Sequence, residues 1–95
     1  MFKFKFNKIH FSKLSDKQVL ALAIYAEEED SKIYFSFANT FKKEFPETAK
    51  LFDEMGKEEN EHRKLLIDLY KNKFGSSIPI VKWEHVSGFY KRKPI

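Results

Sequence analysis

Glu59 and His62 lie three residues apart in a stretch that is otherwise apolar at helical spacing. Taken in alternating steps of three and four, one face of the predicted helix presents Phe52, Met55, Glu59, His62, Leu66 and Leu69. The glutamate and the histidine stand in the middle of this row. A carboxylate and an imidazole one turn apart can bind a divalent metal ion, but they can also hydrogen-bond each other or form a chance pair on a solvated surface.

A second row contains a third candidate ligand, Glu27. The row comprises Leu20, Ile24, Glu27, Ser31, Tyr34, Phe37 or Ala38, and Phe41. No Lys or Arg falls on either row at the level of Glu27, and a buried carboxylate without a cationic partner must be protonated or bind a metal. The alternative for Glu27 is a solvated position, because Glu28, Glu29 and Asp30 continue an acidic run.

Two long helices are predicted to position these side chains. Ser15 and Gln18 have the spacing of a capping box, and the helical pattern that follows is uninterrupted as far as 41–45. Pro46 suits the first turn of a second helix, which is predicted to run to about Lys73 and to stop at Gly75. The short link allows an antiparallel hairpin, whose middles meet, so Glu27, Glu59 and His62 should converge.

The chain is therefore predicted to be all-α, with three segments. These are a basic N-terminal segment (1–14), the helical hairpin (15–75) and a C-terminal tail (76–95) with a short helix near Trp83–Tyr90. A hairpin of this size is half of a four-helix bundle and leaves apolar surface uncovered, which favours a homodimer. Gly56 in the middle of a helix indicates a close approach of the two helices.

Composition excludes several classes of protein. The 95 residues contain no Cys, which excludes disulfide scaffolds and thiolate metal sites. The net charge of +4 arises at the two ends of the chain, while 13 of the 14 acidic residues lie between Asp16 and Asp68. Such basic ends are typical of solvated tails, or next of segments that contact anionic lipid, and a nucleic-acid partner is not expected.

In a homodimer the candidate ligands double to four carboxylates and two imidazoles. This is the ligand set of a carboxylate-bridged di-iron or di-manganese site in a four-helix bundle. Iron is the predicted metal, and manganese or zinc suits the same ligands. The neighbouring acidic residues, Glu28, Glu29, Asp30, Glu58 and Glu61, then have two interpretations, a solvated face or a cation entry path with an additional weak site.

The order and spacing of these residues over 15–75 resemble the rubrerythrin and ferritin-like proteins. In the first helix the matching features are Glu27, Tyr34 and Ala38, and in the second the Glu59-x-x-His62 motif. The resemblance implies Glu27, Glu59 and His62 as metal ligands and Tyr34 as a residue just outside them, although a tyrosine in such a row is also typical of a core. Glu58, Glu29 and Asp30 are further candidate ligands.

The chain has one hairpin where rubrerythrins have two, and it lacks their Cys-rich domain. In this it is similar to encapsulated ferritins and to the ferritin-like head of membrane-bound ferritins. These resemblances imply an encapsulin shell or a membrane iron-transporter domain as partner. A ring of dimers is expected separately, from exposed aromatic residues such as Phe35 and Tyr90. The implied location is the cytoplasm, the cytoplasmic face of a membrane or a protein nanocompartment.

The predicted activity is oxidation of Fe²⁺ by O₂ at a di-iron centre across the dimer interface, serving iron storage, detoxification or delivery. Three alternatives stay open. The first is a structural or sensing module in which a redox-inert ion such as Zn²⁺ or Ca²⁺ holds the dimer. The second is rubrerythrin-like peroxide scavenging, and the third is an adaptor that binds a membrane surface through its basic ends.

Overall fold

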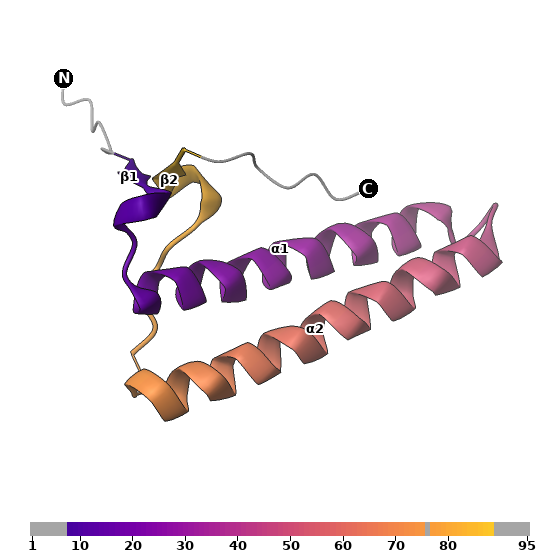
Figure 1. Cartoon of the computed structure of the whole chain (residues 1–95). Coiled ribbons are helices and arrows are strands. Elements are labelled where there is room, and N and C mark those ends of the chain that lie inside the picture. The colour runs from indigo at the N-terminus through magenta and orange to yellow at the C-terminus, as the bar shows by residue number, and fades with distance from the viewer. Residues whose placement is uncertain (1–7, 76, 89–95) are drawn as a thin grey trace, which may run out of the picture.

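The computed structural model describes residues 8–75 and 77–88. Its main feature is a pair of antiparallel helices, α1 (Asp16–Phe41) and α2 (Pro46–Phe74), which lie side by side along their length (Figure 1). The predicted all-α hairpin and the ends of both helices are confirmed. Within the described residues, neither helix is long and apolar enough to cross a membrane.

Local hydrogen bonds fix the ends of the helices. The Ser15 hydroxyl accepts from the amide of Gln18 at 3.2 Å, and the Ser15 amide donates to the Gln18 side chain at 2.9 Å, so the predicted capping box is present. Pro46 occupies the first turn of α2. Gly75 ends the helix with φ of +96°, a conformation that glycine adopts without steric cost.

The face that α2 turns toward α1 differs from the predicted row by a small rotation. The buried residues of α2 are Ala49, Gly56 and Tyr70, whereas Leu69, a member of the predicted row, is 51% exposed. Gly56 explains the close approach at the middle, since a Cβ atom there would lie 2.8 Å from the ring of Phe35. The predicted row therefore lies along one edge of the interface between the helices.

The tail crosses the N-terminal part of α1 and closes a small core with it, which we call the clasp (Figure 1). It contains the strand β1 (Ile9–His10), paired in parallel with β2 (Val86–Ser87) (Figure 1). Behind this pair, Val81 and Val86 pack with Ala21 and Leu22 of α1. The predicted short C-terminal helix is a single 3₁₀ turn, Trp83–His85, and Tyr90 lies outside the described residues.

Candidate metal centre

The structure brings Glu27, Glu59 and His62 together at the middle of the hairpin. One potential ligand atom from each residue lies within 4.8 Å of the other two. His62 Nδ1 is 3.7 Å from a Glu27 oxygen and 3.9 Å from a Glu59 oxygen. Glu27 comes from α1 and the other two residues from α2, so the pairing of the helices assembles the group, as predicted.

These distances separate two interpretations of the group. Both exceed the roughly 2.7–3.2 Å of a nitrogen–oxygen hydrogen bond, so a simple Glu–His hydrogen bond does not account for the arrangement. A metal ion with bonds of about 2.0–2.2 Å would hold its ligand atoms up to about 4.4 Å apart. The distances of 3.7 and 3.9 Å from His62 to the two carboxylates are below this limit, and the 4.8 Å that encloses all three ligand atoms is slightly above it.

The three side chains differ in their exposure to solvent. The side chains of Glu27 and Glu59 are 20% and 16% exposed, while that of His62 is 56% exposed. Glu59 Oε2 is buried and has no hydrogen-bond partner, which is costly for a carboxylate oxygen unless another group binds it. Carboxylate and imidazole donors fit iron, manganese or zinc, so the residues present fit the expected metal.

The other predicted site residues lie outside this group. Glu29 and Glu58 are exposed and Asp30 is partly buried, and none belongs to the metal-competent cluster found among the described residues. Tyr34 is 6% exposed, and its ring stacks on Phe52 with 6.3 Å between the ring centres. By its burial and its contact with Phe52, Tyr34 is a core residue of the hairpin.

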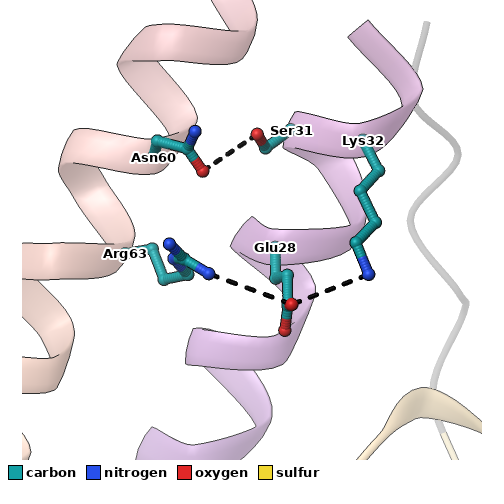
Figure 2. A network of polar contacts seen from close by, with 5 residues as sticks. All are labelled: Glu28, Ser31, Lys32, Asn60 and Arg63. Atoms are coloured by element: carbon teal, nitrogen blue, oxygen red, sulfur yellow. Dashed lines mark hydrogen bonds and ion pairs between the residues drawn. The ribbon is translucent and has the colours of Figure 1, made fainter. Parts of the chain in front are cut away.

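Sequence reasoning missed a set of polar contacts that join the two helices beside this group (Figure 2). Arg63 of α2 reaches across to Glu28 of α1, with 3.9 Å from Nη1 to Oε1, and Lys32 lies 3.6 Å from the same oxygen. The Ser31 hydroxyl donates to the Asn60 side chain at 3.0 Å. The expectation of no cation at this level needs correction, because Arg63 lies one residue beyond the predicted row.

Exposed apolar side chains flank the metal-competent group along the side on which His62 is exposed, which we call the open face. Leu65 and Leu69 follow His62 at helical spacing and are 67% and 51% exposed. Val19 of α1 is 51% exposed and lines a groove of about 250 Å³ together with Leu69. Leu51, five turns before Leu69 on α2, is 56% exposed on the same side.

Comparison of the sequence with known proteins assigns the chain to a family. No curated protein sequence and no solved structure matches the chain. The family model described as rubrerythrin matches residues 18–95, which include α1 except its first two residues, all of α2, the three candidate ligands and the tail. The chain belongs to the rubrerythrin family, within the ferritin-like superfamily.

Proposed function

We propose that this protein binds Fe²⁺ and oxidises it with O₂ at a centre made by two copies of the chain. The observation that carries the proposal is the convergence of Glu27, Glu59 and His62, with an oxygen of Glu59 buried and lacking a hydrogen-bond partner. Membership of the rubrerythrin family supports iron as the metal.

The number of ligands in one chain favours a site shared with a second copy. One chain supplies two carboxylates and one imidazole, which is half of the set that holds two metals in a four-helix bundle. His62 is exposed toward the open face, where Val19, Leu65 and Leu69 also lie. A second copy packed on this face would cover the apolar side chains and complete the ligand set.

The residues of the chain would bind the ions and set their charge environment. The carboxylates of Glu27 and Glu59 carry negative charge in a partly dry site, which favours Fe³⁺ over Fe²⁺. Two Fe²⁺ ions held there as substrate would each lose one electron, and the two electrons with two protons from solvent would reduce one O₂ to hydrogen peroxide. The exposed edge of His62 leaves the site accessible until the second copy covers it.

The test is an anaerobic Fe²⁺ titration of the purified chain, followed by admission of air while oxygen uptake is recorded. We expect about one iron per chain and oxygen uptake in the wild type. Glu59→Ala and His62→Ala should each weaken iron binding by more than roughly 100-fold, since loss of a metal ligand costs more than loss of an outer partner. Oxygen uptake should fall as iron binding weakens in these two variants.

Glu61→Ala is the matched control, because Glu61 is an exposed carboxylate two residues from Glu59 and pairs with Lys64. This variant should bind and oxidise iron like the wild type. Iron binding without oxygen uptake would overturn the proposed reaction and leave a structural metal site. Equal loss in Glu61→Ala and Glu59→Ala would overturn the site itself.

A further inference from the structure

Glu59 and Arg63 of α2 are partly buried, have opposite charges and do not pair with each other. Arg63 follows Glu59 by four residues, the spacing and order at which a glutamate and a basic residue pair well on one helix. Yet Glu59 Oε2 and Arg63 Nε are both buried without a hydrogen-bond partner. Another contact must therefore hold the Arg63 guanidinium away from the Glu59 carboxylate.

Glu28 of α1 is the group that holds Arg63. Its carboxylate lies 3.9 Å from Arg63 Nη1 (Figure 2). The two side chains are 35% and 31% exposed, so water screens the pair less than it screens a surface pair. Two neighbouring residues of α1 thus contact two neighbouring residues of α2, Glu27 with His62 and Glu28 with Arg63.

We propose that Glu28 is a positioning residue that diverts Arg63 from Glu59 and so keeps the Glu59 carboxylate available to a metal ion. This role rests on the proposed metal site. Without Glu28, the guanidinium would be able to turn to Glu59, which lies one turn away on the same helix and has a buried oxygen without a hydrogen-bond partner. A metal ion would then have to displace a charge-assisted hydrogen bond before it could bind.

The proposal predicts a rescue that a merely structural role does not. In a Co²⁺ titration followed by absorption, Glu28→Gln should weaken binding about tenfold, the cost of breaking one charge-assisted hydrogen bond. Arg63→Gln should bind Co²⁺ at least as tightly as the wild type, and the double variant Glu28→Gln/Arg63→Gln should recover that affinity. Lys32→Gln is the matched control, since it removes the other cation beside Glu28 without releasing Arg63.

The outcomes distinguish this proposal from the metal site on which it depends. If the wild type and Glu59→Ala bind Co²⁺ equally, the site itself is overturned. If Glu59→Ala loses binding but Glu28→Gln keeps the wild-type affinity, only the role of Glu28 is overturned. A loss in Glu28→Gln that the double variant does not recover, with melting temperature lowered in both, would mean that the ion pair merely supports the hairpin.

A second measurement requires no metal. The Nε–H signal of Arg63 in nitrogen–proton correlation spectra should shift in Glu28→Gln as the guanidinium finds Glu59. The shift should disappear in Glu28→Gln/Glu59→Gln. An Arg63 signal that is the same in these two variants would show that Arg63 does not turn to Glu59, and would overturn the proposal.

Discussion

The two sides of the hairpin differ most at its middle, in how their polar side chains are paired. On the open face, two carboxylates and an imidazole lie together between exposed leucines. On the opposite side, which we call the closed face, three contacts follow one another along the hairpin: Phe35 with Gly56, Ser31 with Asn60 and Glu28 with Arg63. On the closed face a hydrogen bond and an ion pair join the two helices of one chain, whereas on the open face an oxygen of Glu59 is buried without a hydrogen-bond partner.

This difference shows how one helix pair can be both rigid and reactive. Like charges on the open face repel each other, which pushes the helices apart when no cation is bound. The closed face opposes this with a hydrogen bond from a residue that is only 3% exposed and with an ion pair of opposite charges. The contacts that hold the hairpin together are therefore separate from the groups proposed to bind the metal.

The largest expected effect comes from charging the open face. Leu65→Lys/Leu69→Lys should abolish self-association, because lysines at a covered apolar face would repel their counterparts and remain unpaired. Helical content should stay unchanged, since both leucines are more than half exposed in one chain. Analytical ultracentrifugation measures the association, and Ile80→Lys, at a 69% exposed residue in the tail, is the control. A double variant that remains dimeric would place the interface elsewhere.

Metal removal should weaken the same association by a smaller amount. Chelation leaves the clustered carboxylates of two copies to repel each other, so the chain should shift toward the monomer. Glu59→Ala should lose the dependence of assembly on metal. The measurement is sedimentation of the wild type and the variant with and without Fe²⁺ under anaerobic conditions. A metal-free chain that dimerises as well as the loaded one would mean that the apolar side chains suffice.

On the closed face, Asn60→Ala should lower the free energy of unfolding by about 1–3 kcal/mol, because it leaves the buried Ser31 hydroxyl without a partner. Urea unfolding followed by circular dichroism measures this loss. Removing both polar groups in Ser31→Ala/Asn60→Leu should restore part of the stability. If the single variant is as stable as the wild type, the hydrogen bond does not lock the two helices.

Gly56→Ala should destabilise the chain by about 1 kcal/mol, since crowding against Phe35 outweighs the gain in helix propensity. The control is Phe35→Leu/Gly56→Ala, in which the smaller side chain relieves the contact. Thermal unfolding of both variants provides the comparison. A stabilised Gly56→Ala would show that the ring moves aside and that close approach is not required there.

The smallest effect is expected at an exposed pair on α2. Asp53 accepts a hydrogen bond from Lys57 at 2.9 Å, which raises the pKa of Lys57 above its ordinary value of 10.5. Asp53→Asn should bring that pKa back toward the ordinary value, as an NMR titration would measure. A raised lysine pKa contributes stability that is fully present below the ordinary value and is lost at higher pH, so Asp53→Asn removes this contribution at neutral pH. Because both side chains are exposed to solvent, the contribution is small, and unfolding near neutral pH should barely change.

The sequence predicted the hairpin well because its signals are local. The capping box at Ser15, the proline at position 46 and the glycine at position 75 each act within a few residues, and the helices begin and end where these residues indicate. Convergence of Glu27, Glu59 and His62 followed from antiparallel geometry and needed no other information. Family resemblance pointed to the same three residues.

The rotation of α2 and the formation of the clasp could not be predicted from local sequence signals. On α2, apolar residues occupy two neighbouring rows, for example Leu69 in one and Tyr70 in the next, so periodicity alone does not show which row faces α1. Close approach at Gly56 selects the row of Tyr70. The pairing of Ile9 with Val86 joins residues far apart in the chain, and no local motif indicates it.

That pairing has a consequence for the order in which the chain assembles. The helices meet through a link of four residues, 42–45, so their contacts close short loops and should form early. The clasp closes a loop from Ile9 to Val86, which spans most of the chain, and it is held by a ladder of two residues per strand. Hydrogen exchange should therefore find the amides of the clasp opening well before those in the middle of the hairpin, with Ala21 and Leu22 of α1 becoming accessible at that step.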